Sequence, residues 1–435
     1  MVNERRLVTI GELCDAGIAE LQTGPFGTQL HAHDYLDQGI PIVPTEAIRN
    51  RRIDRSVLPM ISARKADELA RHRLEVGDIL FARRGVQATG HIGVVRAPEV
   101  GFICGTGAIR LRVARNNEVV DADFLSHVLA NPRSVEWFKF HAIGATMPNL
   151  NEGIIRSFSF EAPSLTEQLA ITDILSTLED KIELSRRMNE TLEAAARAIF
   201  KDWFVDFGPT RAKQEGRPAY LARDVWSLFP DHLNGDGRPH GWTIGSIYEI
   251  AEVIYGAPFA SSQFNSTKIG QPLIRIRDLP HETPGVWTPE IHPKGYKVSA
   301  GDVVVGMDGE FRAYLWGGAD AWLNQRVCVF APKPGYSSAF VRNSIIALLA
   351  HVEATEIATT VIHLGKNDIE RFTVVLPGTG VLSTFNNLVQ PLYTRIVENK
   401  RETRAVGALR DLVLPKLMSG EVRTKVAEAI IEGTP

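Results

Sequence analysis

The 435-residue chain has little of what marks secreted, membrane-spanning or metal-binding proteins. Its three cysteines, Cys14, Cys104 and Cys328, show neither a disulfide framework nor a zinc-like spacing, which suits a reducing cytosol. No apolar run approaches the ~18 residues of a membrane span, so we expect a cytoplasmic protein without a membrane partner. A net charge of -3 indicates no particular partner, nucleic acid included.

Catalytic motifs are missing as well. There is no GxxxxGK[ST] loop for a nucleotide phosphate and no Asn or Asp followed by Pro-Pro-Tyr, the motif of amino-methyltransferases. The Glu-x-Lys pairs at 179–181 and 398–400 lie on predicted helices and lack the preceding Asp of a nuclease site. His31 and His33 are the only close histidine pair, and a surface loop explains them better than a metal. We therefore expect no catalytic residue, metal or cofactor in this chain.

The chain does contain a long predicted helix from Ser164 to Phe204. Pro163 precedes it, Ser164 is a suitable N-cap, and Glu167 stands where a capping box requires an acidic residue. Apolar residues recur with the alternating three-and-four spacing of a helix packed along another helix. These seam residues are Leu175, Leu178, Ile182, Leu192 and Ile199, interrupted by the polar Ser185 and Asn189.

A second helix repeats this pattern near the C-terminus. Residues 395–415 align with residues 181–201 at a constant offset of 214 residues. Asn399 falls on Ser185 and Thr403 on Asn189, so the polar interruptions repeat together with the apolar seam. Because a polar seam residue costs stability but fixes register and partner orientation, we expect these two helices to lie side by side.

The repeat extends beyond the helices, which indicates a duplicated chain. Residues 147–163 align with 361–377 at the same offset, and segments 73–79 and 39–43 resemble 297–303 and 270–274. We predict four parts in an internal pseudo-two-fold repeat: a globular domain, a helix, a second globular domain and a second helix. Their bounds are 1–163, 164–207, 208–377 with its globular part from about 241, and 378–435.

Local patterns predict an α+β fold for both globular parts. On the strand Ala108 to Val113 we expect Ile109 and Leu111 to point inward and Arg110 and Arg112 to point out. We expect Pro391 to kink the second long helix and Pro415 to end it. The other predicted strands are 40–44, 78–82, 91–96, 157–160, 272–277, 302–306 and 326–330, and the shorter helices are 63–72 and 123–138.

Several of these segments together resemble the specificity subunit of type I restriction-modification systems. They are APSLTEQ at the start of the first long helix, DKIELSRRMNETLEAAARAIFKDWFVDFGPTRAK at 180–213, the restart at Gly241-Trp242 and the closing LRDLVLPKLMSGEV. The resemblance covers essentially the whole chain. It implies two target recognition domains, each reading half of a split DNA sequence, with the two long helices as an antiparallel coiled-coil spacer.

The resemblance also implies partners, because such a subunit has no known catalysis of its own. These are double-stranded DNA, two modification subunits that methylate adenine with S-adenosylmethionine, and restriction subunits that translocate DNA with ATP and cut it. The cofactors S-adenosylmethionine, ATP and Mg would belong to those subunits. One departure concerns a Leu-Asn-Gln triplet of recognition domains, which is present at 323–325, whereas the first domain has Gly-Thr-Gly at 105–107.

Candidate DNA contacts follow the Gly-Asp strand of each domain, where a glycine-containing loop is rich in polar side chains. Arginine can pair with guanine, glutamine with adenine, and acidic groups with cytosine N4. The runs Gly24 to Gly27 and Gly256 to Phe259 could bring backbone near phosphates. The candidates are Arg83, Arg84, Gln87 and Thr89 in the first domain and Asp308, Glu310, Arg312 and Tyr314 in the second, with Arg110 and Arg112 as phosphate contacts.

Two other interpretations stay open on the residues alone. A duplicated α/β enzyme would need an acid, base or nucleophile cluster in one copy and activity without partners. A protein scaffold built on the long helices would bind no DNA even with its partners present. The glycine-rich polar loops of both repeats favour DNA binding over the scaffold.

Overall fold

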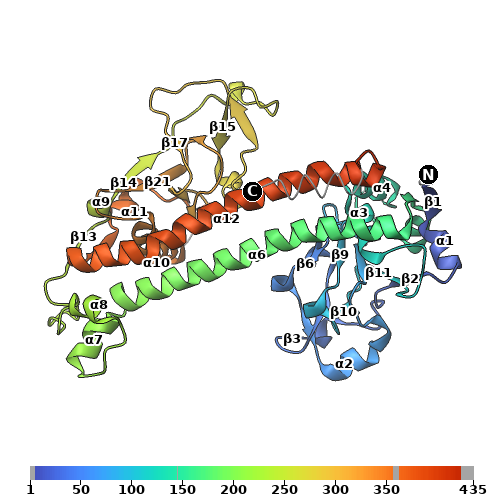
Figure 1. The fold of residues 1–435 in the computed structure, drawn as a ribbon, viewed down its shortest axis with the longest axis horizontal. Coiled ribbons are helices and arrows are strands. Elements are labelled where there is room, and N and C mark those ends of the chain that lie inside the picture. Colours follow the sequence, from blue (N-terminus) through green and yellow to red (C-terminus); the bar gives the residue numbers. More distant parts are fainter. Residues whose placement is uncertain (1–4, 145, 356–361, 423–435) are drawn as a thin grey trace. The chain divides into compact units, whose positions relative to one another are not determined.

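The computed structural model describes residues 5–144, 146–355 and 362–422. Contacts group the chain into two compact units, Met1–Leu178 with Leu409–Pro435 (unit 1) and Glu179–Ala408 (unit 2). Each unit therefore contains a segment of both long helices, α6 (Leu165–Phe204) and α12 (Thr379–Ser419) (Figure 1). The four-part division of the sequence describes the repeat rather than these units, and its bounds stay a prediction.

Unit 1 is built on two four-stranded sheets and a two-stranded ribbon. The first sheet is antiparallel with the order β2-β11-β8-β9, and the second has the order β10-β4-β7-β3 with β10 parallel to β4. Its strands are β1 (Arg6–Thr9), β2 (Ala19–Thr23), β3 (Tyr35–Leu36), β4 (Ile40–Val43), β7 (Met60–Ile61), β8 (Ile79–Ala82), β9 (Ile92–Val94), β10 (Ile103–Cys104), β11 (Ala108–Val113) and β12 (Ser159–Ala162), with the short pair β5 (Ile48–Arg49) and β6 (Arg52–Ile53) beside them.

Both faces of the first sheet of unit 1 are covered. Phe81 and Leu111 face a core shared with α3, α4 and the unit 1 segments of α6 and α12, whereas Leu80 and Ala108 face the second sheet. A sheet covered on both faces leaves no solvent side for polar residues of its central strands. The helices of this unit, besides the long ones, are α1 (Ile10–Asp15), α2 (Ala63–Glu68), α3 (Ala122–Ala130), α4 (Pro132–His141) and α5 (Glu152–Ser157).

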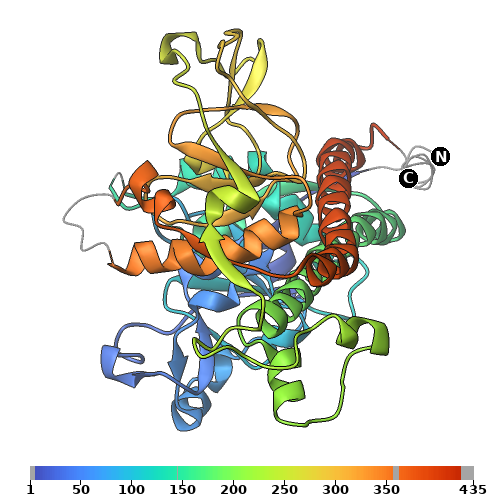
Figure 2. The ribbon, with the colours of Figure 1, turned by 90° about the vertical axis from the view of Figure 1, so that its left-hand side faces the viewer.

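Unit 2 has the same plan. Its first sheet has the order β14-β21-β18-β19 and packs against α10 (Figure 2), and its second has the order β16-β15-β20-β17. The strands are β13 (Thr243–Ser246), β14 (Ala251–Tyr255), β15 (Gln271–Ile274), β16 (Val286–Thr288), β17 (Lys297–Val298), β18 (Val303–Gly306), β19 (Ala313–Leu315), β20 (Ala321–Leu323), β21 (Val327–Pro332) and β22 (Thr373–Leu376). The helices are α7 (Gly208–Gln214), α8 (Arg223–Ser227), α9 (Ile247–Ile250), α10 (Ser338–Thr355) and α11 (Lys366–Glu370).

An aromatic cluster joins the long helices to the globular part of unit 2. Phe200 and Phe204 of α6 contact Phe340 of α10 and Phe385 of α12, with ring centroids 5.0 to 6.0 Å apart. Aromatic pairs at such distances stabilise a core beyond their buried area. The WFVDFGP segment is thus part of the core where α6 ends, and Phe207, with φ 55°, turns the chain out of the helix.

The duplication is visible in the backbone hydrogen bonds. Arg83 N–H donates to Gly107 O in unit 1 (2.9 Å), and Met307 N–H donates to Arg326 O in unit 2 (2.8 Å). The carbonyls of Arg83 and Met307 in turn accept from Leu150 and Leu364, at 2.8 and 2.7 Å. The two units therefore share one strand and loop frame, as the repeat in the sequence predicts.

The long helices run antiparallel within each unit. In unit 2, Asn399 Nδ2 donates to Asn189 Oδ1 (2.8 Å) and Lys181 pairs with Glu402 (2.8 Å). In unit 1, Ile171 and Leu175 of α6 share a core with Val413 and Leu417 of α12. Seam pairing is confirmed, as is the N-cap of α6, where Glu167 N–H donates to Ser164 Oγ (3.4 Å).

Two predicted helix boundaries are wrong. Helix α12 continues past Pro415 to Ser419, because Val413 and Leu417 are buried on the seam on either side of the proline and compensate for its missing hydrogen bond. The predicted helix 123–138 is divided into α3 and α4 at Asn131, whose side chain accepts from Arg133 N–H and caps the helix that Pro132 begins.

Candidate nucleic-acid interface

The loops that follow β8 and β18 occupy equivalent places in the two units. Arg84 forms an isolated antiparallel bridge with Asn149, and Asp308 forms one with His363. The offsets between these positions, 224 for Arg84 and Asp308 and 214 for Asn149 and His363, are the offsets of the sequence repeat. The same backbone frame thus carries different polar side chains in each unit.

Two candidates of the first loop brace the loop from within. Arg83 Nε donates to Asn149 Oδ1 (3.0 Å) and to Leu150 O (3.1 Å). Thr89 is fully buried, and its hydroxyl lies 2.8 Å from Gly85 O and 3.1 Å from Pro148 O. Contacts of this kind fix the loop on its neighbouring segment, so these two side chains position the loop.

The other two candidates of the first loop are exposed. Arg84 and Gln87 line a cleft of about 290 Å³ together with Glu46 and Arg49, which comes from the short strand β5. This places two guanidinium groups and an amide around one concave surface, the residue types that read guanine and adenine edges. Arg49 was not among the sequence candidates. It lies in a basic stretch, residues 49–84, with ten Lys or Arg against five Asp or Glu, and this excess of positive charge is the signal that could have identified it.

In the second unit, Asp308 is held between Arg326 and His363. Arg326 Nη1 lies 2.6 Å from Asp308 Oδ2, and His363 Nδ1 lies 2.7 Å from Oδ1. Burial opposes ionisation of Asp308, but Arg326 and His363 outweigh it and lower the pKa of the carboxyl below its ordinary value. Asp308 is thus an ionised anchor for Arg326 rather than a free acceptor.

Arg326 is a second candidate that the sequence reasoning missed. It is exposed, and its φ of 67° is uncommon for a residue other than glycine. It follows the Leu-Asn-Gln triplet directly, which was the available signal. A charged side chain whose guanidinium is already held through Nη1 by Asp308 loses little conformational freedom when it binds a ligand.

The remaining second-loop candidates differ in exposure. Arg312 pairs with Glu353 (2.8 Å) and with the exposed Glu310 (3.3 Å). Tyr314 packs against the core between the two sheets, where burial raises the pKa of its hydroxyl. Glu310 and Arg312 therefore lie at the surface, and Tyr314 supports the sheet.

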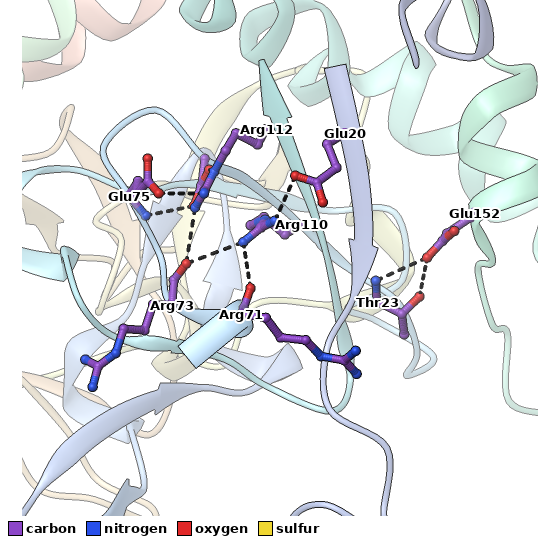
Figure 3. Close-up of polar contacts among 9 residues, drawn as sticks. Glu20, Thr23, Arg71, Arg73, Glu75, Arg110, Arg112 and Glu152 are labelled. Atoms are coloured by element: carbon purple, nitrogen blue, oxygen red, sulfur yellow. Dashed lines mark hydrogen bonds and ion pairs between the residues drawn. The ribbon is translucent and has the colours of Figure 1, made fainter. Parts of the chain in front are cut away.

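The expectation that Arg110 points into solvent is wrong. Its residue is 3% exposed, because the second sheet covers the face of β11 that the alternating pattern assigned to water. Its Nη1 donates to the carbonyls of Arg71 (3.1 Å) and Arg73 (3.4 Å), and its Nη2 pairs with Glu20 (3.3 Å) (Figure 3). A buried charge needs such partners, so Arg110 links the two sheets.

Arg112 is also held inside its own domain. It binds Asp78 through Nε and Nη2, both at 2.7 Å, and Glu75 through Nη1 at 2.6 Å (Figure 3). These hydrogen bonds to Asp78 raise the pKa of the guanidinium, and Asp78 itself is 1% exposed. Its role as a phosphate contact stays a prediction.

The glycine runs mark close approaches of backbone to backbone. A Cβ on Gly24 would lie 1.9 Å from Gly105 O, and one on Gly256 would lie 2.0 Å from Asn324 O. The same contact in both units makes Asn324 equivalent to Gly105. The triplet 323–325 therefore corresponds to residues 104–106, one position earlier than the segment 105–107 expected from the sequence.

In the described ranges, no three or more His, Cys, Asp and Glu side chains are grouped so that they could hold a metal ion. No helix among those residues is long and apolar enough to cross a membrane.

Comparison with known proteins gives concordant matches. Residues 10–194 match the family model for the type I restriction modification DNA specificity domain. The chain is 26% identical over 321 residues to the type I restriction enzyme MjaIX specificity subunit of Methanocaldococcus jannaschii, covering 70% of each chain. It is 24% identical over 362 residues to the HindI specificity subunit of Haemophilus influenzae, covering 71% of this chain and 79% of that one.

The fold is also similar to a solved one. The crystal structure of the type I restriction-modification S subunit from M. genitalium matches with a TM-score of 0.56 and 14% sequence identity, covering 96% of both chains. At that identity the likeness concerns the fold alone, a mixed α+β architecture with two long helices. In sequence, this chain is similar to type I restriction-modification specificity subunits, and the family model for their DNA specificity domain matches residues 10–194.

Proposed function

We propose that this chain is the sequence-specific DNA-binding subunit of a type I restriction-modification complex. Each recognition domain reads one half of a split site on double-stranded DNA, and the two long helices set the unread gap between the halves. Two modification subunits dock on the chain and methylate adenine, and restriction subunits complete the nuclease. The chain itself carries no catalysis, and it acts in the cytoplasm.

The observation that supports this proposal concerns the loops after β8 and β18, which share their backbone hydrogen bonds but carry different polar side chains. Where unit 1 has Arg84 and Gly107, unit 2 has Asp308 and Arg326. Each unit thus has an exposed arginine close to the equivalent backbone bridge. In unit 1 it is Arg84, which follows β8, and in unit 2 it is Arg326, which precedes β21. Arginine pairs bidentately with guanine, so an arginine that comes from another strand reaches a guanine at another position of the DNA. A duplicated frame with exchanged polar residues fits two different half-sites.

The cofactors follow from this division of roles. S-adenosylmethionine belongs to the modification subunits, and ATP and Mg belong to the restriction subunits. The contribution of this chain is to hold those subunits over a chosen sequence, which requires groove-facing side chains and a rigid frame. The residues proposed for base contacts are Arg84, Gln87 and Arg49 in the first domain and Arg326, Glu310 and Arg312 in the second.

The experiment is to co-express the chain with its modification subunit in a host without adenine methylation and to map methylated adenines across the genome. The proposal expects a split motif with two short specific halves and a fixed gap. If the modification subunit assembles with this chain but no defined sequence is methylated, the proposal fails and a protein scaffold on the long helices becomes the better interpretation.

Residue-level variants test the base contacts. Arg84→Gln should relax sequence preference in one half-site and Arg326→Gln in the other, each by about 1 to 3 kcal/mol of base discrimination. Arg395→Gln, at an exposed arginine of α12, is the matched control and should change neither half. Uniform loss of methylation on all sequences would instead assign the two arginines to phosphate binding.

A further inference from the structure

Glu282 of unit 2 has two unusual properties for a glutamate. It is 8% exposed, and its φ is 51°, a left-handed conformation that residues with a side chain seldom adopt. It lies in the loop between η7 (Ile276–Asp278) and β16, at the edge of the second sheet. A strained backbone at a buried charge persists only where the surrounding contacts hold it, and such residues concentrate at functional positions.

The contacts that hold Glu282 come from the long helix α12. Its Oε1 accepts from Lys400 Nζ (2.5 Å), and its Oε2 accepts from Arg404 Nη1 (3.1 Å). Lys400 and Arg404 are one helical turn apart, so their cations project from the same face of α12. One buried carboxylate therefore bridges two helix cations.

The β19–β20 loop reinforces this contact. Gly317 N–H donates to Glu282 Oε2 (3.2 Å), and Lys400 Nζ also donates to Leu315 O (2.8 Å). A Cβ on Gly317 would lie 2.8 Å from Lys400 Cδ, so the loop backbone lies directly on the lysine stem. Through these atoms the loop that carries Glu282 and the β19–β20 connection between the two sheets are attached to α12.

The equivalent position in unit 1 carries the opposite charge. Arg51, which precedes Glu282 by the repeat offset of 231 residues, is also buried (4% exposed) and left-handed (φ 59°). Its backbone forms an isolated bridge with Gly93, whereas Glu282 contacts the equivalent Gly317 through its side chain. Its guanidinium binds Asp123 (2.9 Å) and Ser126 (2.9 Å) of α3. The duplication thus preserved a buried charge and its backbone strain at this position but reversed its sign. At this position a glutamate has the charge that complements a helix face carrying Lys400 and Arg404, whereas an arginine would be repelled by it.

We propose that Glu282 is the positioning residue that fixes the tilt of the second recognition domain on α12 and thereby the gap at which its half-site is accepted. This inference rests on the proposed DNA recognition. The first sheet is attached to the long helices through the core around Phe200, Phe340 and Phe385 and through α10, where Arg342 pairs with Glu193 (3.1 Å). The carboxylate of Glu282 adds a further point of attachment, and each added point constrains the orientation of the domain. Loss of the charge leaves Lys400 and Arg404 facing each other and opens the loop.

The test uses the complex of the full chain with its modification subunit. Methylation rates are measured on duplexes with the mapped half-sites and with the mapped gap, one base pair fewer or one more. In Glu282→Gln, the ratio of rates on the mapped gap to rates on altered gaps should fall about tenfold, while base preference within each half is unchanged. Glu398→Gln, at an exposed carboxylate of α12, is the control and should keep the parental ratio.

A second variant covers the case in which Glu282→Gln does not fold. Lys400→Gln changes only the helix side of the pair, and it should relax the gap in the same direction. The double variant should add nothing further, because both changes break one interaction. Unchanged gap discrimination, or equal loss of methylation on all gaps, would overturn the inference alone. A parent complex that methylates no split motif would overturn the proposed function and this inference with it.

Discussion

Asn399 of α12 donates its side-chain Nδ2 hydrogen to Asn189 Oδ1 of α6, 2.8 Å away, on the seam between the two helices. Asn399 is fully buried, and its own Oδ1 has no partner among the described residues. A buried polar pair of this kind stabilises a helix pair less than leucines would, but it is satisfied in one register only. The pair therefore sets how far α6 and α12 are staggered in unit 2.

Removing one partner of this pair should destabilise the chain. Asn189→Leu leaves the Asn399 amide buried without its acceptor, so the free energy of unfolding should fall by about 1 to 3 kcal/mol. Replacing both residues with leucine should recover most of the loss. Urea unfolding followed by circular dichroism measures both variants. Thr191→Leu, exposed on the same helix, should stay within about 0.5 kcal/mol of the parent, and an equal effect there would contradict the assignment.

The seam in unit 1 should depend on Leu175. This residue is 0% exposed and packs in the core that α6 shares with α12. Leu175→Ala should lower the free energy of unfolding by about 2 to 5 kcal/mol, because it removes buried methyl groups and leaves a cavity. Leu184→Ala removes the same atoms from a leucine that is 63% exposed. If denaturant midpoints shift equally for both, the packing of the helix face is not as described.

The two equivalent glycines should be equally intolerant of a side chain. Gly24→Ala and Gly256→Ala each place a Cβ within about 2 Å of a carbonyl oxygen, so the backbone must shift. We expect each variant to lower the melting temperature and lose about 1 to 3 kcal/mol. Gly27→Ala is the control, since nothing lies within 4 Å of its Cβ position. A stable Gly256→Ala protein would argue against the shared loop frame.

Acid should weaken unit 1 through His72. Burial, together with the charges of Arg71 and Arg110, lowers the pKa of this histidine to about 4. Since the unfolded chain binds the proton at higher pH, the stabilising contribution is present above pH ~6.5 and is lost as pH falls toward 4. In His72→Leu, the free energy of unfolding should fall by about 2 to 3 kcal/mol less than in the parent as the pH drops across that window.

The measurement is the denaturant midpoint of the full chain at several pH values. The exposed His33→Gln variant serves as the control. Parallel profiles for the parent and His72→Leu would show that the buried ring does not couple folding to protonation.

Local sequence patterns predicted the long elements well. The seam of α6 and α12, the cap at Ser164 and the strand Ala108–Val113 were all predictable, because each depends on residues within a few turns or along one strand. Boundaries failed at Pro415 and Asn131, where a distant packing partner or a cap outweighed the rule for proline. The duplication was also readable, since equivalent backbone positions need similar residues.

The candidate site was less predictable. Arg110 alternates with apolar residues as an exposed side chain would, yet a second sheet built from distant segments covers it. Arg326 becomes a candidate only when Asp308, 18 residues away in sequence, lies 2.6 Å from it. Local periodicity predicts neither the burial of Arg110 nor the pairing of Arg326, because both depend on how loops of different length bring separate strands together.

The sequence by itself determined the helix pair, the repeat and the resemblance to the family, because periodicity and motif are properties of contiguous residues. The tertiary structure decided which charged side chains are paired inside each domain and which remain exposed at its surface. Glu282 illustrates the difference: its sequence neighbours mark an ordinary turn, and only the approach of Lys400 and Arg404 makes it a buried anchor. The role of a charged side chain depends on the residues that bury it and pair with it, and those residues are distant in the chain.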